Sequence, residues 1–215
     1  MIRVNVLYAA PPDGDDASAA YATRASSFFT KQPPGNPAIH LGHVGPLIVD
    51  EDRSGGDGVP WRTAPSKGNA GVADGDDARA ATSLTLFLIS CAADGAVHRS
   101  VRQLVRRLKS ASSTKAAASA LAAKAEEATT APAASGTRYY ALAALGHARC
   151  ENSANQMADA IFGAGRRFDK ALVGSGVVES VCPRLETQVE LCGPEVQFDP
   201  WLELLLGKLK QHCSE

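Results

Sequence analysis

Residues able to do chemistry gather in two short segments, and each follows directly on an apolar run. The segment at 90–98 follows the run at 84–89 and supplies a hydroxyl, a thiol, a carboxylate and an imidazole. The segment at 146–150 follows the run at 139–145 and supplies a second imidazole and a second thiol. The carboxyl ends of parallel strands meet at one edge of a sheet, where open α/β sheets bind their ligands. We therefore expect both segments to lie at one binding edge.

Zinc is one ligand that these side chains suggest, because two thiolates and two imidazoles can hold it in a tetrahedron. The set would be Cys91, His98, His147 and Cys150. Their spacing matches no compact zinc motif, so we interpret them as ordinary loop residues. His40 and His43, in a His-Leu-Gly-His run, are interpreted in the same way. The sequence shows no Ser/His/Asp arrangement and no carboxylate pair at a catalytic spacing.

The central unit that positions the first segment is a strand, a turn and a helix. Apolar residues fill 84–89, which suits a strand buried on both faces. A turn follows at 92–95. From Arg99 onward, apolar residues recur at the spacing of an amphipathic helix, at Val101, Leu104, Val105 and Leu108. This unit is half of a parallel α/β motif.

Further strands are predicted at 3–8, 44–49, 139–145 and 177–181. A helix is predicted between the first two of these strands. It starts at Asp15 or Asp16, either of which could cap it, and runs to about Thr30.

Two more helices follow the strand at 139–145. The first begins near Met157, is interrupted at Gly163 and Gly165, and ends at Gly174. The last is predicted at 198–209, with Asp199 as its cap and a proline in its first turn. Five strands alternating with helices predict an α/β fold, a doubly wound five-stranded parallel sheet with helices on both faces, in one domain spanning 1–215.

The composition is that of an ordinary globular chain. At 215 residues with 45% hydrophobic residues, it is long enough to bury one core and short for two. The formal net charge of -1 argues against nucleic acid or an anionic membrane as the partner. The cysteines are odd in number and form no Cys-x-x-Cys pair, which indicates reduced thiols rather than a disulfide framework. No run suits a signal peptide or a membrane span, so a cytoplasmic location is expected.

Two stretches are predicted to be insertions. Residues 50–82 hold many glycines and aspartates and few apolar residues, which is typical of a mobile surface excursion. Residues 112–130 are rich in alanine, which favours a helical insertion over a low-complexity spacer. A basic cluster precedes the second insertion, on the helix predicted from Arg99 onward. We interpret this cluster as the solvated face of that helix, and docking of an acidic partner is the alternative. Its members are Arg102, Arg106, Arg107 and Lys109.

Five short stretches carry a resemblance that spans nearly the whole chain. They are the strand end at 6–10, Ser-Cys-Ala-Ala-Asp-Gly from Ser90, Ala-Leu-Gly ending at Gly146, Gly-Arg-Arg-Phe-Asp-Lys-Ala-Leu from Gly165, and Phe-Asp-Pro-Trp from Phe198. In this order they resemble the flavodoxin-like domain of diflavin reductases such as cytochrome P450 reductase. Some radical tRNA-modifying enzymes carry the same domain.

The resemblance implies a flavodoxin-like sheet of strand order 2-1-3-4-5, with FMN held by three loops. The residues that it places against FMN are Ala10, Pro11, Pro12, Gly14, Asp15, Ser90, Cys91, Ala92, Ala93, Asp94, Gly95, Leu145, Gly146, His147 and Cys150. It implies an FMN-binding electron-transfer module that works with a FAD/NADPH reductase module, which can belong to the same longer polypeptide, and with a protein electron acceptor. An active chain would then be part of an NADPH-dependent flavin oxidoreductase.

The flavin loops depart from the family pattern. The first loop, at 10–16, has no hydroxyl, includes two prolines that have no N–H to donate, and puts three aspartates where a phosphate dianion would sit. The third loop lacks the family's flavin-stacking tyrosine. Two alternatives therefore stay open: a flavodoxin-like scaffold that has lost FMN and binds a protein partner, and a domain serving a tRNA-modifying radical enzyme.

Overall fold

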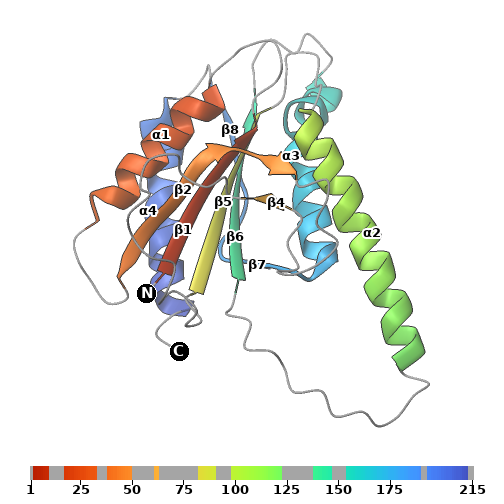
Figure 1. Cartoon of the computed structure of the whole chain (residues 1–215). Helices are drawn as coiled ribbons and strands as arrows, with labels where there is room; N and C mark the ends of the chain where they lie inside the picture. The colour runs from red at the N-terminus through yellow and green to blue at the C-terminus, as the bar shows by residue number, and fades with distance from the viewer. Residues whose placement is uncertain are drawn as a thin grey trace.

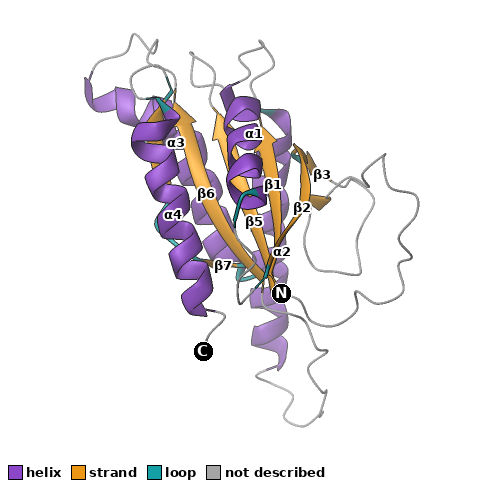
Figure 2. Ribbon diagram, turned by 90° about the vertical axis from the view of Figure 1, so that its left-hand side faces the viewer, coloured by secondary structure: helices purple, strands orange, loops and turns teal. Residues whose placement is uncertain are grey.

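The computed structural model describes residues 2–9, 17–32, 38–49, 61–62, 82–90, 98–122, 138–146, 154–189 and 193–212 (Figure 1). A sheet forms the middle layer. One of its faces is covered by α1 (Ala17–Thr30) and α4 (Pro194–His212), and the other by α2 (Arg99–Ala122) and α3 (Ala154–Ser175). Figure 2 shows these layers from the side. Within the described ranges, no helix combines the length and the apolar character that a membrane span needs.

The main sheet consists of β1 (Ile2–Ala9), β2 (Ile39–Pro46), β5 (Thr82–Ser90), β6 (Arg138–Gly146), β7 (Glu179–Ser180) and β8 (Leu185–Gln188). Its order is β2-β1-β5-β6-β7, β8 also pairs with β6, and these pairings are all parallel. Together β7 and β8 take the place of a fifth strand. The predicted doubly wound sheet and its order are therefore confirmed. A separate antiparallel pair joins β3 (Ile48–Val49) to β4 (Trp61–Arg62).

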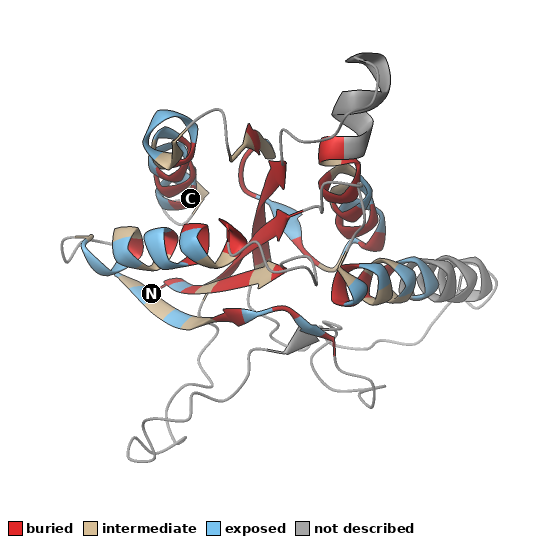
Figure 3. Cartoon of the chain, turned by 90° about the horizontal axis from the view of Figure 1, so that it is seen from above, coloured by how far each residue is buried: buried red, intermediate tan, exposed pale blue. Residues whose placement is uncertain are grey.

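The strand β5 lies at the centre of the hydrophobic core. Its side chains alternate between two clusters: Leu84, Leu86 and Leu88 pack toward α1 and α4, and Phe87 and Ile89 toward α2 and α3. Burial of each such side chain contributes roughly 1.5–3 kcal/mol. A strand covered on both faces has no polar face, which explains the continuous apolar run. Figure 3 shows buried residues concentrated in the sheet and on the inner faces of the helices.

The edge strand β2 begins earlier than the sequence predicted. It runs over Ile39–Pro46 instead of 44–49, and pairs with β1 along its length. His40 and His43 are therefore strand residues, not loop residues. The backbone N–H of His43 donates to the Asn5 side chain at 3.0 Å, where the register of the two strands shifts. An edge strand keeps one side in solvent, so its first residues carry little apolar signal.

A single helix, α3, spans the region where the sequence predicted an interruption at Gly163 and Gly165. That prediction is wrong because Gly165 has a packing role. A Cβ atom at this position would lie 2.4 Å from the Cβ atom of Ala144 on β6. The glycine lets the helix approach the sheet, and this tertiary contact outweighs the low helix propensity of glycine.

The fifth strand is split, whereas the sequence predicted one strand at 177–181. Only two residues form β7, beside the start of β6, and β8 pairs with the end of β6. Pro183 lies between them and has no N–H for a sheet ladder. Its carbonyl accepts a hydrogen bond from the indole N–H of Trp201 at 2.9 Å. The polar sequence of β8, Leu-Glu-Thr-Gln, carries no strand signal of its own.

The last helix, α4, also begins earlier than predicted, at Pro194 instead of Phe198. Proline suits a first helical position because its fixed φ matches the helix and its missing N–H is not needed there. Asp199 does not cap the helix. Its carboxylate accepts a hydrogen bond from Nε of Arg24 at 2.7 Å and so ties α4 to α1.

The two predicted insertions are described only in part. Residues 112–122 continue α2, so the first half of the alanine-rich stretch extends an existing helix, and 123–130 lie outside the described residues. Of the stretch at 50–82, the structure describes the two residues of β4 and the first residue of β5.

Replacement of Gly165 by alanine is expected to destabilise the protein by about 1–3 kcal/mol, because the added methyl group overpacks the contact with β6. Urea denaturation of the Gly165→Ala variant measures this change. Gly207 is the control: nothing lies within 4 Å of a Cβ atom there, so Gly207→Ala should stabilise its helix by about 0.5–1 kcal/mol. A Gly165→Ala variant as stable as the wild type would show that helix and sheet can separate at no cost.

Candidate functional site

The carboxyl ends of the parallel strands form the candidate site, at the top of Figure 1. The strands β1, β5 and β6 lie side by side there, with Ala9 paired to Ile89 and Ser90 paired to Leu145. From these ends the chain leaves toward helices on opposite faces: α1 follows β1, and α2 follows β5. Such a divergence is a topological switch point, where open α/β sheets form a crevice for ligands.

Three of the sequence-predicted site residues lie within the described chain, and all three are at this edge. Ser90 and Leu145 are fully buried strand ends in direct register. Gly146 ends β6, and a Cβ atom there would lie 1.9 Å from Cγ2 of Ile161 on α3. The absence of a side chain at Gly146 is therefore a packing requirement, whatever the loop after it binds.

The other predicted site residues lie outside the described residues. They are Ala10, Pro11, Pro12, Gly14 and Asp15 in the first loop, Cys91, Ala92, Ala93, Asp94 and Gly95 in the second, and His147 and Cys150 in the third. The possible helix caps Asp15 and Asp16 are outside as well. The strands and helices nevertheless place the attachment points of all three loops at one edge.

Two buried hydroxyls that the sequence analysis missed lie near this edge. Ser18 stands in the first turn of α1 and Thr187 near the end of β8, both almost without exposed surface. Neither Ser18 Oγ nor Thr187 Oγ1 has a hydrogen-bond partner among the described residues. Thr187 is paired with Leu145, so it faces the same side of the sheet as α1. Buried hydroxyls usually have partners, so unpaired ones at a strand edge are candidate ligand contacts.

His98 is a helix cap. Its Nδ1 lies 2.6 Å from Ser100 Oγ and accepts the backbone N–H of Ser100 at 3.3 Å, at the start of α2. Within the described ranges, no group of His, Cys, Asp and Glu side chains could hold a metal. The other residues of the hypothetical zinc set, Cys91, His147 and Cys150, lie outside those ranges. Burial and the nearby Arg102 lower the pKa of His98, which favours the neutral ring that can accept at Nδ1.

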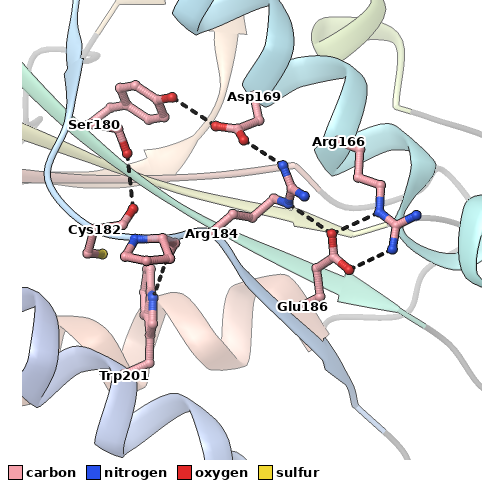
Figure 4. Close-up of polar contacts among 9 residues, drawn as sticks. Arg166, Asp169, Ser180, Cys182, Arg184, Glu186 and Trp201 are labelled. Atoms are coloured by element: carbon pink, nitrogen blue, oxygen red, sulfur yellow. Dashed lines mark hydrogen bonds and ion pairs between the residues drawn. The ribbon is translucent and has the colours of Figure 1, made fainter.

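A network of ion pairs fixes the split fifth strand against α3 (Figure 4). The Tyr140 hydroxyl donates to Asp169 at 2.8 Å, and Arg184 pairs with both Asp169 and Glu186. Arg166 completes the chain with two hydrogen bonds to Glu186, at 2.9 and 2.8 Å.

The titration of these groups follows from their partners. The Arg166 and Arg184 guanidiniums hold the pKa of Glu186 below 4.5, and burial together with the bond to Asp169 raises the pKa of Tyr140. Carboxylates and guanidiniums satisfy one another here, so the network is a clamp that positions β8 and Thr187 at the candidate site.

A groove of about 740 Å³ lies between α1 and α4. Ala17, Val189 and Pro194 line the end nearest the carboxyl edge, and Tyr21 and Phe28 contribute aromatic surface. The Arg24–Asp199 pair is part of its lining and neutralises both charges. The groove therefore offers a mixed surface beside the site, with no cluster of reactive groups among the described residues.

Comparison with known proteins identifies the architecture. No family model matches the chain, and no curated protein is significantly similar to it in sequence. The solved structures that match it include two point mutants of flavodoxin from Pseudomonas aeruginosa, in which a cysteine is replaced by serine in one and by alanine in the other. Each is 14% identical over 97% of this chain and 99% of that chain, with TM-scores of 0.51 and 0.52.

The fold is flavodoxin-like. At this level of identity the likeness concerns the fold, and a site must be argued from its own residues. In a flavodoxin-like fold, the neighbours β1 and β5 are the two strands between which the connections diverge. The carboxyl ends of these two strands are therefore the candidate site of this chain.

The cap at His98 predicts a pH dependence of stability. Its pKa in the folded state lies below 6.5, so unfolded chains bind more protons at mildly acidic pH. The contribution of the cap is complete above pH 6.5 and is lost as the pH falls through the lowered folded-state pKa. Thermal unfolding of wild type and His98→Asn, scanned from neutral to mildly acidic pH, measures it. Asparagine caps helices without titrating, so the variant should lose less stability on acidification.

The clamp predicts that Arg184 contributes to the stability of the fold. Arg184→Gln leaves two half-buried carboxylates short of a counter-charge, and should lower the free energy of unfolding by about 1–3 kcal/mol. The difference from wild type should shrink in acid, because the pKa of Glu186 is lowered and its contribution is lost as the pH falls below 4.5. Arg167→Gln is the matched control, since Arg167 is exposed on α3, the helix of Arg166 and Asp169, and belongs to no ion pair among the described residues. Equal effects of both variants would contradict the clamp.

Proposed function

We propose that this chain is an FMN-binding electron-transfer module, with FMN in the crevice at the carboxyl ends of β1, β5 and β6. The observation that carries the proposal is the switch point beside β1, from which two helices depart on opposite faces. The likeness to flavodoxin structures supports it at the level of fold. Bound FMN would supply the redox chemistry, and the chain would supply binding, orientation and exclusion of water.

Each loop would contact a different part of the flavin. Gly14, after β1, would let the backbone approach the phosphate, and the N-terminus of α1 favours an anion. The buried, unpaired hydroxyl of Ser18 follows directly and would add the donor that the first loop itself lacks. The loops at 91–95 and 147–150 would enclose the ring system, because they leave the paired strand ends Ser90 and Leu145.

The first loop also gives the main reason for a second candidate function. In the proposed site Asp13, Asp15 and Asp16 would bring negative charge to the phosphate, and like charges at contact distance cost about 1 kcal/mol each, even in water. These residues favour weak FMN binding, or a scaffold that has lost FMN and acts through a protein partner. A flavin titration separates the two functions.

The resemblance to diflavin reductases extends the first proposal to its partners. We infer a FAD/NADPH reductase module as the electron donor, on the same or a separate polypeptide, and a protein as the acceptor. A domain that serves a tRNA-modifying radical enzyme is the alternative within the same fold. These assignments follow from the five matching stretches of sequence and stay proposals.

The test is titration of the purified chain with FMN and with riboflavin, followed by flavin fluorescence. We expect saturable binding of FMN in the micromolar range. Removal of negative charge in Asp15→Asn/Asp16→Asn should tighten FMN about tenfold and leave riboflavin, which has no phosphate, unchanged. Glu179→Gln is the control for general charge, because β7 pairs with the opposite end of β6. No binding of either flavin at roughly millimolar concentration would refute the electron-transfer proposal and favour the scaffold.

A further inference from the structure

The exposed face of α2 carries a ridge of three arginines, Arg99, Arg102 and Arg106. Their spacing of three and four residues puts them on one side of the helix. All three are exposed, whereas Val101 and Leu104, on the opposite side, are buried against the sheet. We call these three residues the arginine ridge. Figure 3 shows the exposed residues of α2 on the side facing away from the core.

The described residues supply no counter-charge to the ridge. No acidic residue occurs anywhere in the sequence of α2. None of the ion pairs among the described residues includes Arg99, Arg102 or Arg106. The neighbouring helix α3 adds exposed Arg167 and Lys170 on the same side of the sheet, so the surroundings increase the charge.

The ridge opposes the stability of its own helix. Arg99 and Arg102 lie in the first turn of α2, where the positive end of the helix dipole disfavours cations. Arg102 and Arg106 are four residues apart, a spacing at which like charges repel. A sequence that departs from local preferences without a structural gain indicates a functional constraint. Folding of α2 does not explain these arginines, so we look for a partner.

We propose that the arginine ridge is a docking surface for an acidic protein partner. Arginine forms paired hydrogen bonds with carboxylates, and three arginines over two helical turns match carboxylates on one face of a partner helix or loop. The net charge of -1 disfavours a nucleic acid or an anionic membrane, because both require a broadly basic surface.

The position of the ridge connects it with the candidate site. Arg99 is the first residue of α2, which begins next to the carboxyl end of β5. A partner lying along the ridge would therefore reach the edge where the flavin is proposed to bind. Identification of this partner as a redox partner depends on the proposed function, whereas the docking itself does not.

The test measures binding of a fluorescently labelled, glutamate-rich helical peptide by fluorescence anisotropy at low ionic strength, without flavin. We expect Arg102→Glu/Arg106→Glu to weaken binding at least about tenfold. The control is Lys31→Glu/Lys208→Glu, which changes the net charge equally at exposed positions on α1's end and on α4, and should stay within about twofold of wild type. The peptide assay contains no FMN, so its result does not depend on flavin binding. A chain that binds the peptide but fails to bind FMN in the separate titration would contradict the proposed function and leave the docking proposal standing.

Stability supplies a second readout that a structural role for the ridge would not give. Arg102→Glu puts a carboxylate at the start of α2 and an attractive pair with Arg106, so its thermal midpoint should rise while peptide binding falls. The proposal would be overturned by a wild type that does not bind the peptide, by equal losses in both double variants, or by a loss of stability in Arg102→Glu. Tighter binding of duplex DNA or phosphatidylserine vesicles than of the peptide would also overturn it.

Discussion

Complete burial of β5 and β6 between two layers of helices is the constraint on which the rest of the structure depends. Parallel strands cannot be joined by hairpins, so each connection crosses over through a helix. Both faces of the central strands are apolar, so the helices must divide between the two faces. Crossover helices can cover both faces only if the helices that follow two neighbouring strands lie on opposite faces of the sheet. The strands β1 and β5 are such a pair. The switch point at the carboxyl edge is a consequence of this packing.

Several of the buried hydroxyl side chains lie near the carboxyl edge of the sheet. Within the sheet, hydroxyls of Ser90 and Thr187 lie at strand ends, and Ser18 opens α1 beside the same edge. At the edge of the sheet, β7 and β8 are short and form few backbone hydrogen bonds with β6. The ion pairs of Arg184 with Asp169 and Glu186 add to the attachment of this edge. These ion pairs therefore position β8, with Thr187, at the carboxyl edge.

The charged groups are unevenly distributed around this edge. The arginine ridge begins where α2 leaves the site, whereas the exposed surface of α4 is mixed, with Glu195 and Glu203 beside Lys208 and Lys210. A chain with a net charge of -1 therefore has one locally basic surface among its described residues. Such a distribution orients an approaching protein, since complementary charge affects the rate and geometry of association more than its final affinity. An electron-transfer module needs this kind of transient, oriented contact.

The sequence by itself determined the class of fold, and the resemblance that five of its stretches carry gave the order of the strands. A continuous apolar run such as 84–89 indicates a strand with both faces buried, and nearly every residue of β5 is buried. Tertiary structure alone decided the continuity of α3 through Gly165, the strand at His40 and the split around Pro183. In each case a contact with a distant segment outweighs local preference: Ala144 for the glycine, β1 for the edge strand, and Trp201 for the proline carbonyl. Such contacts leave no local pattern, because their partners lie far apart in the chain.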